Sequence, residues 1–195
     1  MTDKILPNDV EYYYKKNRFL SLLISTRKWR DLILSKEALV SISLAFITTY
    51  IVNNIYSTLA TKDFCNFIGY LLLTTGIGLI GMLGFLVSGM AIISGTIGNK
   101  ILKNINSERK FDKIISIVFS FYFDGALIGI TLVLFFFTYL SLQTNWMISV
   151  MKVHILSFGA AYLFWFVVTY SIMLLGTLLR LLILTYRYDY DEETP

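Results

Sequence analysis

Long apolar stretches separated by short polar ones are the main pattern along the chain. Four stretches carry almost no charge: residues 38–60, 64–98, 114–142 and 153–184. About 20 consecutive apolar residues in a helix cross the hydrocarbon core of a bilayer, so each stretch is long enough for one crossing. The three longer stretches imply tilted helices or protruding ends. The pattern predicts an all-α membrane protein with four transmembrane helices.

The polar stretches divide the chain into three parts. Residues 1–37 form an N-terminal segment, residues 38–184 the transmembrane domain and residues 185–195 an acidic tail. From Asn17 to Lys36, apolar and basic residues interleave as they do in amphipathic helices that lie in the membrane interface. We expect this interfacial helix to lie along the inner leaflet or to cover one end of the bundle. Its role as a plain anchor and its role in partner docking both remain open.

The distribution of lysine and arginine predicts the orientation. Residues 1–37 hold eight of the 17 basic residues, the 99–113 loop holds five, and two more lie near the C-terminus. Basic residues concentrate on the cytoplasmic side of membrane proteins. Both termini and the 99–113 loop are therefore expected in the cytoplasm of a bacterial cell, with the protein in the inner membrane. The two remaining connections are too short for an external domain, so a large partner must dock from inside.

Composition supports a membrane protein without catalytic chemistry. Charged residues make up 15% of the chain, against about a quarter in soluble proteins. The net charge of +4 comes from basic residues beside the apolar stretches, a placement that fits anionic lipid and argues against direct nucleic-acid binding. Cys65 is the only cysteine, which excludes an intrachain disulfide. Phosphate-binding loops, zinc motifs and serine-nucleophile motifs are absent from the sequence, so we expect no enzyme, no cofactor and no metal site.

Small residues recur at helical spacing in the second apolar stretch. Closely approaching helices in lipid use such seams, because packing rather than apolar burial drives their association. The seam predicts contact with another span of the same chain or with a second subunit, and a pore-lining or hinge role is a third possibility. Its members are Gly81, Gly84, Ser88, Ala91, Gly95 and Gly98.

Asp124 is the single acid inside an apolar stretch. A charge at the bilayer centre costs about 2.5–3.5 kcal/mol, so this side chain must be neutral or paired. Ser120, one turn earlier, is a candidate hydrogen-bond partner, and Arg180 is a candidate countercharge. A structural hydrogen bond or ion pair and a proton- or cation-responsive site are both open readings. Asn53 and Asn54, in the first stretch, are expected to bridge helices or to line a constriction in an oligomer.

Three cytoplasmic regions are candidates for partner docking: the N-terminal segment, the 99–113 loop and the tail. The tail combines tyrosines with acids, and tyrosines supply contact area that a purely solvating tail does not need. The docking candidates are Lys103, Arg109, Lys110, Tyr188, Tyr190, Asp191, Glu192 and Glu193.

A short four-span chain with a basic N-terminal segment, a charged 99–113 loop and an acidic tail resembles the membrane subunit of the bacterial Kiwa antiphage defence system. The resemblance is one of length and layout over the whole chain. It implies a homo-oligomer, expected to be a tetramer, that works with a cytosolic DNA-binding partner, KwaB, to detect infection at the membrane. The expected function is an oligomeric membrane scaffold and sensor. The alternative is a small ion channel or membrane-disrupting effector, with Asp124 or Asn53 near a constriction.

Overall fold

The protein is an all-helical bundle in the parts of the chain that its computed structural model describes, which are residues 19, 23–24, 28–96, 111–144 and 150–193. Four of its helices are long and apolar enough to cross a membrane, which confirms the predicted four-span, all-α fold. The elements are η1 (Lys28–Arg30), α3 (Asp31–Leu34), α4 (Lys36–Thr58), α5 (Thr61–Thr96), α7 (Phe111–Gln143) and α8 (Val150–Glu193).

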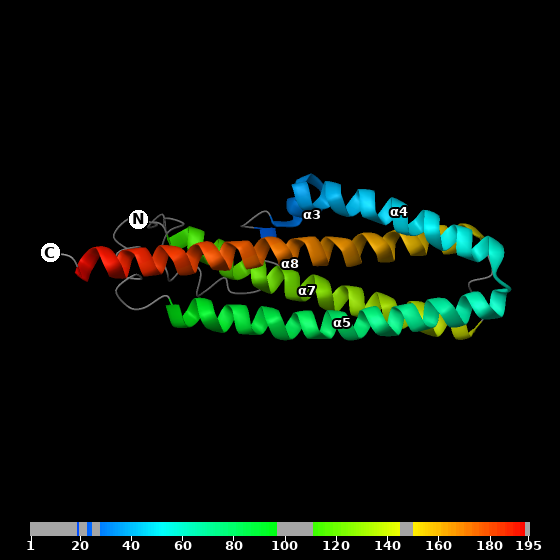
Figure 1. Cartoon of the computed structure of the whole chain (residues 1–195). Helices are drawn as coiled ribbons and strands as arrows, with labels where there is room; N and C mark the ends of the chain where they lie inside the picture. The colour runs from blue at the N-terminus through cyan, green and yellow to red at the C-terminus, as the bar shows by residue number, and fades with distance from the viewer. Residues whose placement is uncertain (1–18, 20–22, 25–27, 97–110, 145–149, 194–195) are drawn as a thin grey trace, which may run out of the picture.

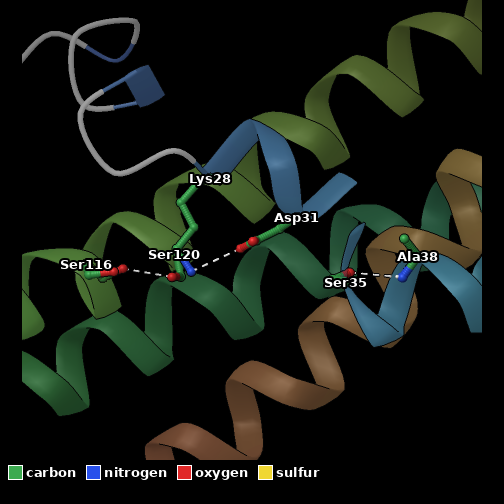
Figure 2. A network of polar contacts seen from close by, with 6 residues as sticks. All are labelled: Lys28, Asp31, Ser35, Ala38, Ser116 and Ser120. Carbon is green, nitrogen blue, oxygen red and sulfur yellow. Dashed lines mark hydrogen bonds and ion pairs between the residues drawn. The ribbon is translucent and has the colours of Figure 1, made fainter. Parts of the chain in front are cut away.

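Local signals fix the beginning and the end of α4. Ser35 has an extended backbone, and its side chain accepts a hydrogen bond from the Ala38 backbone N–H at 3.0 Å, which caps the first turn (Figure 2). Leu59 returns to an extended conformation. The chain then turns through residues 59 and 60 alone and enters α5 at Thr61. We call this end of the bundle the turn end, and the opposite end, where α5 and α8 finish, the terminal end.

The four long helices pack in the order α4, α8, α7, α5. α4 lies along α8, α8 against α7, and α7 against α5, whereas α4 and α5 meet mainly near the turn that joins them (Figure 1). Two hydrogen bonds hold α4 on α8. The Ser41 and Thr169 hydroxyls lie 3.0 Å apart, and Trp165 Nε1 donates to Thr48 Oγ1 at 2.9 Å.

Aromatic side chains fill much of the bundle core. Phe166 and Tyr170, one turn apart on α8, stack with ring centroids 5.5 Å apart, and Phe123 of α7 meets the Tyr170 ring edge-on at 5.9 Å. Leu79 and Leu86 supply the buried face of α5. The outer surface is also rich in large apolar side chains, as expected where lipid rather than water surrounds the helices.

α8 extends far beyond α4 at the terminal end (Figure 1). The Ser41–Thr169 contact places the start of α4, five residues before Ser41, beside Leu174 of the antiparallel α8. From Leu174 to Glu193 α8 continues for about 28 Å at 1.5 Å per residue. The helical backbone therefore includes most of the predicted tail.

Described parts of the N-terminal segment lie against the bundle. The Phe19 ring packs on Phe119 and on the edge of Tyr122, with centroid separations of 5.8 and 5.1 Å. The Tyr162 hydroxyl donates to the Leu32 carbonyl oxygen. In the same segment Lys28 forms an ion pair with Asp31 at 3.2 Å (Figure 2). The predicted amphipathic stretch is thus represented by two short helical pieces, η1 and α3, which the extended Ser35 separates from α4.

Candidate functional site

Asp124 lies in the bundle core and is 0% exposed. Its Oδ2 accepts a hydrogen bond from the Ser171 hydroxyl at 2.5 Å, which links α7 to α8. Its Oδ1 has no hydrogen-bond partner within the described part of the chain, and the same holds for the Tyr170 hydroxyl. The site is therefore a buried polar cluster with unused hydrogen-bonding capacity. We refer to Ser120, Asp124, Tyr170 and Ser171 as the Asp124 cluster.

Ser120 does not bond to Asp124 as expected. Its hydroxyl donates instead to the Ser116 carbonyl oxygen at 2.7 Å, one turn back on α7 (Figure 2). Serine hydroxyls in helices commonly bond to the carbonyl four residues earlier, which satisfies the side chain locally. Ser120 also lies near the Tyr170 hydroxyl.

The predicted pairing of Asp124 with Arg180 is wrong. Arg180 is exposed on α8, nine residues after Ser171. At 1.5 Å per residue that separation is about 13 Å along the helix axis, too far for a direct contact with a carboxyl group bonded to Ser171. A buried carboxylate in this position would have no countercharge among the described residues, and an unpaired buried charge costs several kcal/mol. The contact that the chain does supply is a hydrogen bond between two spans.

The position of the Asp124 cluster along the bundle follows from its neighbours. Ser171 is two residues after Thr169, which contacts Ser41, the sixth residue of α4. The cluster therefore lies near the terminal end of α4 rather than midway along it. Because the Asp124 side chain is fully buried and bonded to Ser171, the cluster acts as a polar clamp between α7 and α8.

The predicted small-residue seam of α5 faces away from the bundle. Gly81, Gly84, Ser88, Ala91 and Gly95 are all exposed. A Cβ atom added to Gly81, Gly84 or Gly95 would meet nothing within 4 Å. At about 100° per residue the seam lies on the side of α5 opposite Leu79 and Leu86. No other described span covers it, and Gly98 lies outside the described residues.

A second set of glycines on α5 makes the contacts inside the chain. A Cβ atom on Gly69 would lie 3.4 Å from the Tyr139 ring, and one on Gly89 only 2.9 Å from Cε1 of Phe121 and 3.3 Å from Leu178 Cδ1. These glycines allow α5 to approach α7 and α8 closely. Sequence reasoning missed them, although Gly89 is three residues after the apolar Leu86 and so shares its face of the helix.

The remaining candidates do not converge on one place. Asn53 is half-buried and Asn54 is exposed near the turn end of α4. Lys103, Arg109 and Lys110 lie outside the described residues. The backbone from Tyr188 to Glu193 belongs to α8, but the structure does not describe these side chains. Within the described ranges, no group of three histidine, cysteine or acidic side chains is arranged to hold a metal ion.

The fold and the site define a multi-pass α-helical membrane protein with a polar clamp in its core and an uncovered small-residue face. Comparison with known proteins identifies no relative of the chain. No protein family matches the chain, and no curated protein and no solved structure matches it.

Proposed function

We propose that this protein is an oligomeric membrane scaffold and sensor subunit that assembles through the small-residue seam of α5. The seam carries the proposal. In lipid, glycine and serine stripes stabilise helix contacts by letting backbones approach closely, whereas a lipid-facing helix gains nothing from them. A Cβ atom added at Gly81, Gly84 or Gly95 would meet no described residue within 4 Å, so this part of the surface is open to a second copy.

The apolar terminal half of the bundle supports the same proposal. α4 has 23 residues, or about 34 Å, which already matches the roughly 30 Å hydrocarbon core. α5 has 36 residues, and its part beyond α4 includes Ser88, Ala91 and Gly95 together with the exposed Val87 and Ile92. Helices that exceed the bilayer thickness reduce the mismatch by tilting or by associating. A second subunit on the seam would cover this apolar overhang.

The terminal end is the proposed docking face for a soluble partner. Under the positive-inside rule this end lies in the cytoplasm of a bacterial cell. α8 carries the acidic, tyrosine-rich tail outward on a helix, and residues 97–110 connect α5 to α7 at the same end. The resemblance in layout to the Kiwa membrane subunit suggests the form of the function: recruitment of a cytosolic DNA-binding protein of the KwaB type during antiphage defence.

The Asp124 cluster favours the scaffold over a channel. A conducting role for Asp124 needs contact with a water-filled path, whereas the side chain is 0% exposed and bonded to Ser171. We therefore assign Asp124 a structural role in holding α7 to α8.

The oligomer is tested with bulky substitutions in the seam. Gly84→Leu and Ser88→Leu block close approach without touching the protein's own core, because both positions are exposed. Gly78→Leu is the matched control: an added Cβ there also meets nothing, but Gly78 lies about 100° or more around α5 from the seam centre. Size-exclusion chromatography with light scattering in detergent should show smaller particles for the seam variants only. Unchanged assembly in both seam variants overturns the proposal.

Partner docking is tested separately. The full-length protein and a variant truncated after Ile183 are each mixed with a purified cytosolic DNA-binding protein of the KwaB type, and co-purification is measured. Loss of co-purification with retained assembly supports the docking face. The docking face is refuted if the truncated chain captures the partner as well as the full-length protein does, and a variant with reversed charges at Lys103, Arg109 and Lys110 does so too.

A further inference from the structure

A cavity of about 240 Å³ lies among all four long helices in the half of the bundle near the turn end. Thr48 and Val52 line it from α4, Phe64 and Thr75 from α5, and Trp165 from α8. Apolar cavities of about 150 Å³ in proteins already bind molecules the size of benzene. This cavity is thus large enough for a ligand rather than a packing defect that side chains would close.

The threonine hydroxyls and the Trp165 indole N–H of the cavity wall are already used by the protein. The Thr75 and Thr138 hydroxyls donate to carbonyl oxygens of their own helices at 2.7 Å. The Thr48 hydroxyl donates to Leu44 and accepts the hydrogen bond from Trp165. Each of these threonines therefore offers a ligand no free donor, and its methyl group adds to the apolar wall. A hydrocarbon fits such a surface, whereas a polar ligand would lose hydrogen bonds to water without replacing them.

Two observations indicate that the cavity opens toward the membrane between α4 and α5. These two helices meet mainly near their connecting turn and lie apart along the rest of their length (Figure 1). Leu71 lines the cavity and is also 42% exposed, which marks the open side. The surrounding solvent at this depth is lipid, so an acyl chain is the molecule that meets the opening.

The length of the cavity matches one leaflet. Its lining residues on α5 lie between Phe64 and Thr75, a stretch of twelve residues that rises by about 16 Å along the helix. Half of the roughly 30 Å hydrocarbon core is about 15 Å. The lining begins three residues after α5 starts at Thr61, where the headgroup region is expected.

We propose that the cavity between α4 and α5 binds one acyl chain of a membrane phospholipid from the leaflet at the turn end. The chain enters beside Leu71 and lies along α8 against Trp165. The occupied cavity joins α4 to α5, which have few direct contacts with each other, so the bound lipid becomes part of the bundle.

Trp165 provides the readout, because bromine atoms on an acyl chain quench tryptophan fluorescence on contact. Trp29 and Trp146 are replaced by phenylalanine so that Trp165 is the sole tryptophan, which is excited selectively over the tyrosines. The protein is placed in phosphatidylcholine vesicles containing increasing fractions of phosphatidylcholine brominated at mid-chain. A reporter variant with Trp165→Phe and Phe137→Trp measures ordinary lipid contact, since Phe137 is 61% exposed.

Brominated and ordinary phosphatidylcholine compete equally for a single site, so a bound chain predicts Trp165 quenching that rises in proportion to the brominated fraction. The exposed reporter contacts several lipids at once, so its quenching should rise more steeply at low brominated fractions and then level off. Ser157→Phe and Ala160→Leu, which fill the cavity, should each lower the quenching of Trp165 in fully brominated vesicles severalfold. Ile80→Phe adds bulk at an exposed position outside the cavity and should leave the curve unchanged. Circular dichroism checks that each variant is folded.

Two results overturn the proposal. One is Trp165 quenching that follows the curved dependence of the reporter, as contact with several bulk lipids would give. The other is undiminished Trp165 quenching in whichever cavity-filling variants remain folded.

Discussion

Replacing Gly89 by alanine tests the close packing of α5 against α7 and α8. Gly89 is buried, and the added methyl carbon would lie 2.9 Å from Phe121 Cε1 and 3.3 Å from Leu178 Cδ1. Carbon atoms in contact prefer about 3.5–4.0 Å, so a shift of roughly 0.6 Å or more is required. The Phe121 ring is only 2% exposed and has little room to move. The substitution must therefore displace the ring or separate the helices.

The magnitude follows from a comparison with Gly84→Ala on the same helix. Both substitutions gain about 1 kcal/mol of intrinsic helix propensity, so this contribution cancels in the difference. The extra methyl meets nothing at Gly84, whereas overpacking a core costs about 1–3 kcal/mol. Gly89→Ala should therefore have a free energy of unfolding about 1–3 kcal/mol lower than Gly84→Ala.

The assay is reversible unfolding of monomeric protein in mixed micelles by titration with sodium dodecyl sulfate, followed by circular dichroism. Phe121→Leu in the Gly89→Ala background removes the ring atoms that the methyl group meets and should recover part of the loss. A double-mutant cycle then isolates the coupling between the two positions. Equal unfolding free energies for Gly89→Ala and Gly84→Ala would refute the packing assigned to this face of α5.

Substitutions at three further positions test the polar contacts. Asp124→Asn keeps a carbonyl oxygen for the Ser171 hydroxyl and should change the unfolding free energy by less than about 1 kcal/mol. Asp124→Ala removes the acceptor and should lower the unfolding free energy by about 1–3 kcal/mol. A larger loss for Asp124→Asn than for Asp124→Ala contradicts the clamp. Ser41→Ala removes the contact with Thr169 and should cost about 0.6 kcal/mol, the average for hydrogen bonds between membrane helices, in the same titration. Lys28→Ala breaks a partly exposed ion pair and should cost at most about 1 kcal/mol; a larger value shows that the N-terminal segment is more tightly held than its contacts indicate.

The number of spans was predictable because hydropathy over 20 residues is a strong signal that no tertiary contact reverses. The helix ends were less accurate. α5 begins at Thr61, three residues before the predicted boundary at Phe64, because Lys62 and Asp63 fit easily into its first turn. An acid there is also favoured by the helix dipole. Hydropathy marks where apolar residues begin, whereas backbone hydrogen bonds determine where the helix begins.

The candidate site was only half predictable, since spacing along one helix contains no information about the neighbouring helix. Asp124 was identified as a membrane-embedded acid, but its partner Ser171 is an ordinary hydroxyl in an apolar run and gives no signal of its own. The charge of Arg180 makes it a candidate countercharge in the sequence, although it lies nine residues after Ser171 on α8. On α5, Gly84 and Gly89 have similar local surroundings in the sequence. Only the packing shows that Gly89 faces the core and Gly84 faces outward.

The unbroken helix from Val150 to Glu193 sets the angular position of the tail about the bundle axis. Each residue added after Ile183 would rotate the tail by about 100° and advance it by 1.5 Å, and seven added residues would nearly restore the original direction. A partner that binds the tail and another surface of the protein at once would therefore tolerate an insertion of seven alanines better than one of two. A change in the tilt or rotation of the fourth span would likewise move the tail, because α8 is one continuous helix and would move as a rigid body.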